Sequence, residues 1–163
     1  MHPVLKAFCL ICALSSPVAA LAQGATVAFG GLKQDTSLPV EISADQLSVN
    51  QADGSATFAG NVLVGQGEMR LSAGSVRVEY GQDGKSITRL HATGGVTLAN
   101  RTEAAESRDA VYTIATGEVV MTGDVMLTQG QSALSGQKLV IDLKAGTGVM
   151  EGRVQTIFVP GGN

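Results

Sequence analysis

The sequence predicts an all-β fold made of stacked strand-pair repeats, and three observations support this prediction. The stretch Phe58–Gly67, FAGNVLVGQG, returns 63 residues later as Met121–Gly130, MTGDVMLTQG. Within both copies apolar residues recur at every second position, which is the period of a β-strand. Proline, which lacks the N–H group that a sheet ladder needs, is absent between Pro39 and Pro160.

The first half of each repeat predicts a strand with a glycine bend. Further copies start at Ala92 and, in part, at Met150, at offsets of 34 residues from Phe58 and 29 residues from Met121. A period near thirty residues is typical of a repeat architecture. Each copy has a glycine, then a variable residue, then valine; the glycines are Gly60, Gly94, Gly123 and Gly152. Glycine at this place indicates a tight bend or bulge with a residue at positive φ.

The second half of each repeat predicts a strand that turns a corner. Leu71–Tyr80 aligns with Leu134–Leu143, Ala105–Ile114 is a weaker counterpart, and an unpaired second half opens the series at Ile42–Val49. The apolar parity switches once in each clear copy, between residues 73 and 76 in the first. We expect a bulge or corner there, where the strand passes into the next wall. The chain thus begins and ends with half a unit.

The remaining segments connect or flank these strands. Gly81–Gly84 lies between two strand patterns and predicts a hairpin turn. Residues 23–37 are rich in glycine and polar residues, and we expect a flexible mature N-terminus there. The predicted organisation is a signal peptide over 1–22, this flexible segment, a β domain over 38–160 and a tail over 161–163.

The first 22 residues have the features of a secretory signal peptide. Lys6 precedes the short apolar run Ala7–Leu14, and Ala20-Leu21-Ala22 provides the small residues of a cleavage site near Ala22. The alternative is an uncleaved membrane anchor, but the apolar run is far shorter than the roughly 20 residues that span a bilayer. Cleavage removes both cysteines, so packing alone must hold the exported chain together.

Composition argues against several functions. After cleavage ten basic residues stand against fourteen acidic ones, which disfavours nucleic acid or anionic membranes as partners. The mature chain has one histidine, His91, and no cysteine, so neither a catalytic triad nor a His/Cys zinc site is predicted. Gly84-Lys85-Ser86 lacks the earlier glycine of a phosphate loop, because Glu79 stands there. We therefore expect no catalytic residue, no metal and no cofactor.

The apolar faces of the predicted strands leave two interpretations of the interior open. Each unit is a pair of bent strands that cannot bury an apolar face alone, so neighbouring units would stack around one continuous interior. That interior is lined by aliphatic residues with a few Phe and Tyr and no Trp. It is either an ordinary dry core or a trough for aliphatic chains.

Several stretches resemble the OstA-like family of lipopolysaccharide transport proteins. They are LPVEISADQLSV, TFAGNVLVGQGEMRLSAGSVRVEY, LHATGGVTL, VVMTGDVMLTQGQSALSGQKLVIDL and GRVQTIFVP, which together cover Leu38 to Pro160. The resemblance implies an open antiparallel β-jellyroll in the periplasm that binds lipopolysaccharide by its acyl chains. It also implies head-to-tail self-association and a bridge between LptC at the N-terminal edge and the N-terminal domain of LptD at the C-terminal edge.

The resemblance and the strand parity together give the expected site. Acyl chains are expected to contact inward residues along the whole stack: Val40, Ile42, Phe58, Val62, Val64, Val96, Leu98, Tyr112, Ile114, Met121, Val125 and Leu127. The edges expected to carry assembly contain Val40 and Ile42 at one end, and Ile157 and Val159 at the other. Both ends are apolar and β-prone, and strand edges leave N–H and C=O groups unpaired.

Two other classes of function compete with this hypothesis. A structural or adhesive exported β-solenoid would have a dry core and bind through its surface. An exported enzyme acting on an envelope polymer would need a catalytic constellation, and none is evident in the sequence. Saturable binding of a fluorescent fatty acid would favour the transport hypothesis over the structural one.

Overall fold

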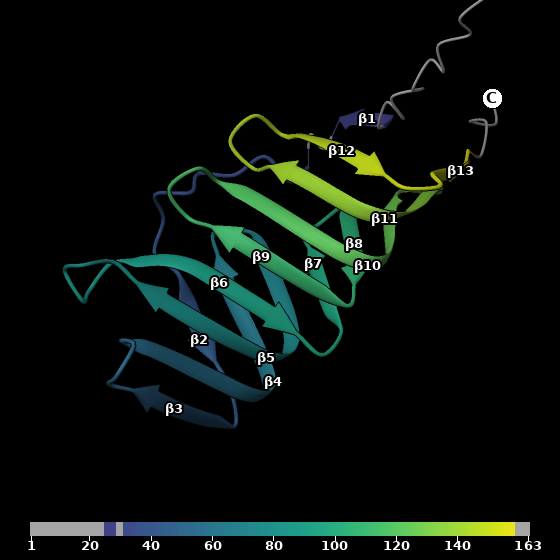
Figure 1. Ribbon diagram of the computed structural model, residues 1–163. Helices are drawn as coiled ribbons and strands as arrows, with labels where there is room; N and C mark the ends of the chain where they lie inside the picture. Colours follow the sequence, from purple (N-terminus) through teal and green to yellow (C-terminus); the bar gives the residue numbers. More distant parts are fainter. Residues whose placement is uncertain (1–24, 29–30, 159–163) are drawn as a thin grey trace, which may run out of the picture.

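The computed structural model describes residues 25–28 and 31–158, which form a 13-stranded antiparallel sheet without a helix (Figure 1). The predicted all-β fold is therefore confirmed. The strands are β1 Ala25–Ala28, β2 Glu41–Ser43, β3 Gln46–Asn50, β4 Ser55–Gln66, β5 Met69–Tyr80, β6 Ile87–Thr93, β7 Val96–Ala99, β8 Glu103–Ser107, β9 Asp109–Thr113, β10 Glu118–Gln129, β11 Ser132–Asp142, β12 Thr147–Glu151 and β13 Gln155–Ile157. Within these ranges no helix is present that could cross a membrane.

Four long strands, β4, β5, β10 and β11, bend and so belong to two walls. The first wall contains the ends of these strands that pair with β3, β6, β9 and β12. The second wall contains the ends that pair with β2, β7, β8 and β13. Figure 1 shows the walls as a stack of strands that runs from β2 and β3 at one end to β12 and β13 at the other.

The corner between the walls is built by bulges in β4 and β10. The pairing of β4 with β5 shifts between Ala59 and Val62, and the pairing of β10 with β11 shifts between Thr122 and Val125. Gly60 has φ 78° and the following Asn61 has φ 47°, a left-handed conformation that glycine and asparagine adopt at low cost. The predicted corner is confirmed. The extra residue lies in β4 and β10, opposite the positions where β5 and β11 change parity.

The two walls enclose one hydrophobic core. Its fully buried side chains come from both walls and from every part of the stack; the largest are Tyr112, Met69, Leu71, Leu90, Leu98, Met121, Leu127, Leu139, Ile141, Leu143 and Met150. The repeat therefore places one apolar face of each strand pair against the next, as stacking requires.

The predicted hairpin turn at residues 81–84 is confirmed. Gly84 N–H donates to the carbonyl of Gly81 at 2.9 Å, and Gly81 N–H donates to the carbonyl of Ser86 at 2.8 Å. The carboxylate of Asp83 accepts from the Ser86 hydroxyl and from the N–H groups of Lys85 and Ser86. These hydrogen bonds lower the pKa of Asp83 to about 2.

The segment before Leu38 differs from the predicted flexible terminus. Residues 25–28 form β1, which pairs with β12, and Leu32 is buried in the core. The physical reason is that β12 would otherwise end the first wall with unpaired backbone groups, which β1 satisfies. The predicted signal peptide over 1–22, its cleavage near Ala22, the edge residue Val159 and the tail over 161–163 lie outside the described residues.

Candidate functional site

The structure brings the predicted inward residues together between the two walls. Eight of them are buried in the core: Val62, Val64, Val96, Leu98, Tyr112, Met121, Val125 and Leu127. The other four, Val40, Ile42, Phe58 and Ile114, are partly buried and pack against that core. All twelve therefore belong to one continuous apolar interior.

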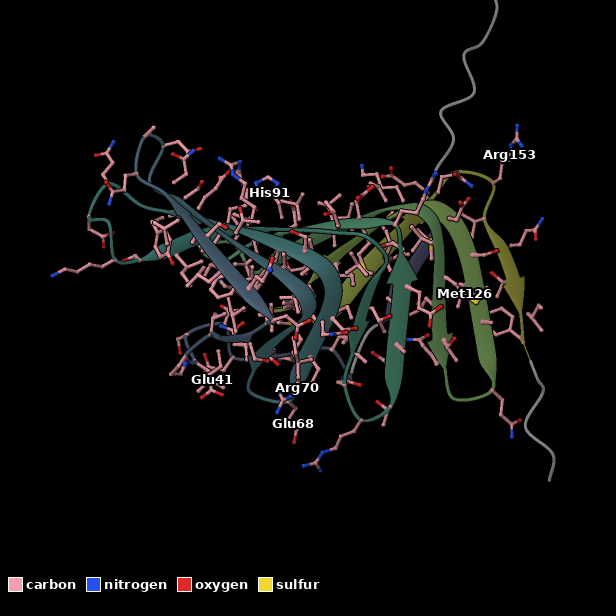
Figure 2. All side chains as sticks on the ribbon, turned by 90° about the horizontal axis from the view of Figure 1, so that it is seen from below. Glu41, Glu68, Arg70, His91, Met126 and Arg153 are labelled. Atoms are coloured by element: carbon pink, nitrogen blue, oxygen red, sulfur yellow. The ribbon has the colours of Figure 1, made fainter. Side chains whose placement is uncertain are left out.

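The bend preserves the inward and outward alternation of the strands in the second wall. Val62 on β4 is 1% exposed, whereas its neighbour Leu63 is 43% exposed. Met126 on β10 is likewise an exposed apolar residue between the buried Val125 and Leu127, and Figure 2 shows it labelled on the green strands. At these positions both faces of the strand carry apolar side chains, but only the outward ones are exposed to solvent.

One polar group in the interior was missed from the sequence. Gln66 ends β4 on the inward face and is only 1% exposed. Its side-chain Oε1 accepts a hydrogen bond from the hydroxyl of Tyr112 at 2.7 Å. Its Nε2 donates to the carbonyls of Thr36 at 3.0 Å and Leu38 at 2.9 Å. The parity of Val62 and Val64 continues to residue 66, so the pattern contained the signal for an inward glutamine.

The environment of Tyr112 keeps its hydroxyl neutral. Burial raises the pKa of Tyr112 to about 12, and the hydrogen bond to Gln66 offsets part of that rise. A neutral hydroxyl is a hydrogen-bond donor, and here it uses that capacity on Gln66. The pair is therefore a neutral polar contact between the walls, with no charge that would repel an apolar ligand.

At the first end of the stack the interior reaches solvent. Leu47 and Val49 on the edge strand β3 are 58% and 67% exposed. They pair with Phe58 and Ala56 of β4, which face inward, so Leu47 and Val49 also continue the inward face. The predicted edge residue Ile42 lies in β2, the edge strand of the second wall, and pairs with Val64 of β4, while Val40 directly precedes β2. This end therefore presents an apolar, unpaired edge.

The other end of the stack is partly covered by the chain itself. In the first wall β1 pairs with β12, so β12 is not a free edge. In the second wall β13 is the last strand, and its Ile157 is exposed. Ile157 pairs with Ala133, the neighbour of the inward Leu134, so Ile157 lies on the outer face of the wall. Of the two assembly residues predicted at this end, Ile157 therefore faces outward. Val159 lies outside the described residues.

Several charged side chains of the outer surface form ion pairs, and Glu79 has two arginine partners, Arg77 and Arg89. Nε2 of His91 lies 3.0 Å from Glu79, without the alignment of a hydrogen bond, and Arg77 lies 3.3 Å from the same carboxylate. Figure 2 places His91 on the outer side of the sheet. Among the described residues no group of His, Asp and Glu side chains is arranged to hold a metal ion.

Comparison with known proteins agrees with this geometry. The chain is 31% identical over 136 residues to the lipopolysaccharide export system protein LptA of Escherichia coli K12, covering 77% of this chain and 74% of that protein. It is 29% identical to an uncharacterised protein of Rhizobium meliloti over 153 residues, covering 87% of this chain and 82% of that one. A 75-residue stretch is 37% identical to LptD of Actinobacillus pleuropneumoniae, covering 46% of this chain and 9% of LptD.

A solved structure has the same fold. LptH of Pseudomonas aeruginosa, described as the LptA homologous periplasmic component of the lipopolysaccharide transport device, superposes with a TM-score of 0.69 at 18% identity, over 77% of this chain and 99% of that one. The predicted β-jellyroll is confirmed by this likeness. Residues 41–147 match the family described as LptA/(LptD N-terminal domain) LPS transport protein. Since this match spans well over half of the sequence, the chain belongs to the LptA/(LptD N-terminal domain) family of LPS transport proteins.

Proposed function

We propose that this protein is a periplasmic bridge that binds lipopolysaccharide and carries it from the inner to the outer membrane. The acyl chains of lipopolysaccharide would lie between the two walls, and its sugars would remain outside. The observation that supports this most is the continuous apolar interior, which runs through every repeat and reaches solvent at Leu47 and Val49. Family membership agrees with a transport role.

The physical chemistry of the interior suits acyl chains. Burying a methylene group stabilises a complex by about 0.8 kcal/mol, so a chain of about a dozen carbons could bind without any polar contact. The interior is closely packed in this structure, since Val64, Leu98 and Met121 are fully buried. Lipid binding therefore requires the walls to part, which replaces contacts between the walls by contacts with the acyl chain.

Assembly would extend the stack at its two ends. We assign LptC to the edge of β2 and β3, and the N-terminal domain of LptD to the opposite end, where β13 is the last strand of the second wall and β1 covers β12 in the first. Exposed edge strands carry unpaired N–H and C=O groups that can pair with another chain. Contacts between different ends are heterologous, so copies of this chain would join head to tail without closing a ring.

The packed interior also supports a second candidate function. A structural or adhesive stack with a dry core would show the same buried residues and would bind no lipid. The two functions make opposite predictions for the interior, whereas neither requires catalysis.

Crosslinking at two adjacent positions tests the proposal. A photo-reactive amino acid at Val62 is expected to capture lipopolysaccharide in the cell, because Val62 faces the interior. The same group at Leu63 serves as the matched control, because that side chain faces outward. Equal capture at both positions would show that the lipid does not lie between the walls. Absence of capture at both, together with no saturable fatty-acid binding by the purified protein, would favour the structural stack.

A further inference from the structure

Residues 31–38, called the strap below, lie along the side of the molecule opposite the glycine corner. Because the long strands bend at the corner, their hairpin turns line the free margins of the two walls. The first-wall margin includes the turn after β11, and the second-wall margin includes the turns β4–β5 and β7–β8. Figure 1 shows residues 31–38 as a purple-blue trace that passes the turn after β11 on its way to β2.

The strap contacts both margins. On the first wall, Gln34 N–H donates to the carbonyl of Leu143 at 2.8 Å. On the second wall, the side-chain amide of Asn100 donates to the carbonyl of Gly31, and Met69 N–H donates to Oε1 of Gln34 at 3.2 Å. The strap therefore spans the opening between the walls.

The strap is held at one apolar and one polar point. Leu32 is buried in the core, while the residues on either side of it, Gly31 and Lys33, are exposed. Gln66 binds the carbonyls of Thr36 and Leu38 from inside and is itself bound by Tyr112. The buried glutamine thus connects the strap to both walls.

We propose that the strap is a displaceable closure of the lipid groove, an inference that rests on the proposed function. An acyl chain that enters from the open side must pass the place that Leu32 and Gln34 occupy. Displacing the strap exposes the buried side chain of Leu32 and breaks a few hydrogen bonds, whereas parting the walls with the strap in place separates many apolar side chains that pack between them. The strap is therefore the element that opens at least cost, and Gln66 is its latch.

A disulfide lock tests this inference. Residues from Gln23 onward contain no cysteine, so an engineered pair has no competing thiol in the mature chain. A Cβ on Gly31 would contact the side chain of Thr102, which makes Gly31→Cys with Thr102→Cys a suitable pair across the strap and the second wall. The matched control is Thr97→Cys with Glu106→Cys, which joins β7 to β8 within one wall and leaves the strap free.

Binding of a fluorophore-labelled palmitic acid is measured for both pairs, oxidised and reduced, after thermal melting confirms the fold. We expect the oxidised strap lock to bind at least tenfold more weakly than its reduced form, and the control pair to bind equally in both. Equal binding by the oxidised and reduced strap lock would overturn the closure while leaving the proposed function intact. No binding by the reduced proteins or by the unmodified chain would overturn the proposed function, and this inference with it.

A second pair of variants does not depend on disulfide formation. Leu32→Ser weakens the apolar anchor of the strap, and we expect severalfold faster uptake of the same palmitic acid probe in stopped-flow measurements. Lys33→Ser alters the exposed neighbour and is expected to leave the uptake rate unchanged. Equal uptake rates for the two variants would contradict the strap as the barrier to entry.

Discussion

The hydroxyl of Tyr112 on β9 lies 2.7 Å from Oε1 of Gln66 on β4, so this hydrogen bond joins the two walls within the apolar interior. The same glutamine donates to two carbonyls of the strap. A buried polar group stabilises a fold only when its partners are present, because an unpaired one keeps its desolvation cost. This arrangement makes the contact a sensitive point of the structure.

Removing the hydroxyl in Tyr112→Phe is expected to lower the free energy of unfolding by about 1–3 kcal/mol, because the buried Oε1 of Gln66 then keeps only a long contact, 3.5 Å, with Nε2 of Gln34. Urea denaturation measures this change. Tyr80→Phe is the control, since Tyr80 is exposed at the end of β5 and its loss should change stability little. Equal effects of the two variants would show that the interior hydrogen bond adds no stability.

The raised pKa of Tyr112 predicts a loss of stability in alkali. Its folded value is about 12, above the ordinary value of 10.0, so the unfolded chain loses this proton first. The stabilisation is fully present below pH 10, falls as pH rises from about 10 to 12, and is lost above the folded pKa. Tyr112→Phe should remove this component. A pH profile of the unfolding free energy that is the same for both proteins would contradict the assignment.

The corner glycines are expected to be required for backbone geometry. Gly123 has φ 85°, and a Cβ there would also contact the side chain of Arg108. Gly95 has a similar φ of 81° with open space around it. Gly95→Ala should therefore report the cost of the dihedral alone, about 1 kcal/mol, and Gly123→Ala and Gly123→Val should cost more. Thermal melting measures both, and an unchanged melting temperature for Gly123→Val would refute the requirement.

Much of the fold could be predicted because the repeat is local and periodic. Alternation identified the interior face of β4 and β10, and the paired change of parity located the corner near Gly60. Of the residues from Val62 to Leu127 that the pattern placed inside, all are buried for this reason except Ile114, which is partly buried. Whether a strand residue faces inward or outward alternates along the chain, so the sequence alone is enough to predict it.

The strap and β1 could not be predicted in the same way. Residues 25–28 pair with residues 147–150, and neither the pairing nor its register follows from a four-residue strand outside the repeat. The strap owes its place to Leu32 and to hydrogen bonds with Gln66, which no periodic signal marks. The contacts of β1 and the strap depend on which surfaces the repeats leave uncovered. They therefore cannot be predicted without the three-dimensional arrangement of the repeats.

Assembly at the first end is expected to depend on the exposed face of β3. Val49→Lys places a charge where a docked strand would be buried, while the monomer tolerates it because Val49 is 67% exposed. We expect weaker concentration-dependent oligomers in light scattering and an unchanged melting temperature. Leu63→Lys, on the outer face of the second wall, is the control and should leave assembly intact. Oligomers of equal size from all three proteins would exclude β3 as an assembly edge.

At the opposite end β1 is expected to compete with the incoming partner. It occupies the edge of β12, which a second copy would need in order to continue the first wall. In an antiparallel pair the N–H groups of successive residues point alternately toward and away from the partner. Of the two prolines Thr26→Pro and Val27→Pro, one therefore removes an N–H directed at β12 and the other does not. One of these two variants should therefore release β1 and strengthen head-to-tail assembly. If both variants assemble as the unmodified chain does, while Val49→Lys still weakens assembly, then copies join at this end through β13 alone and β1 remains in place on β12.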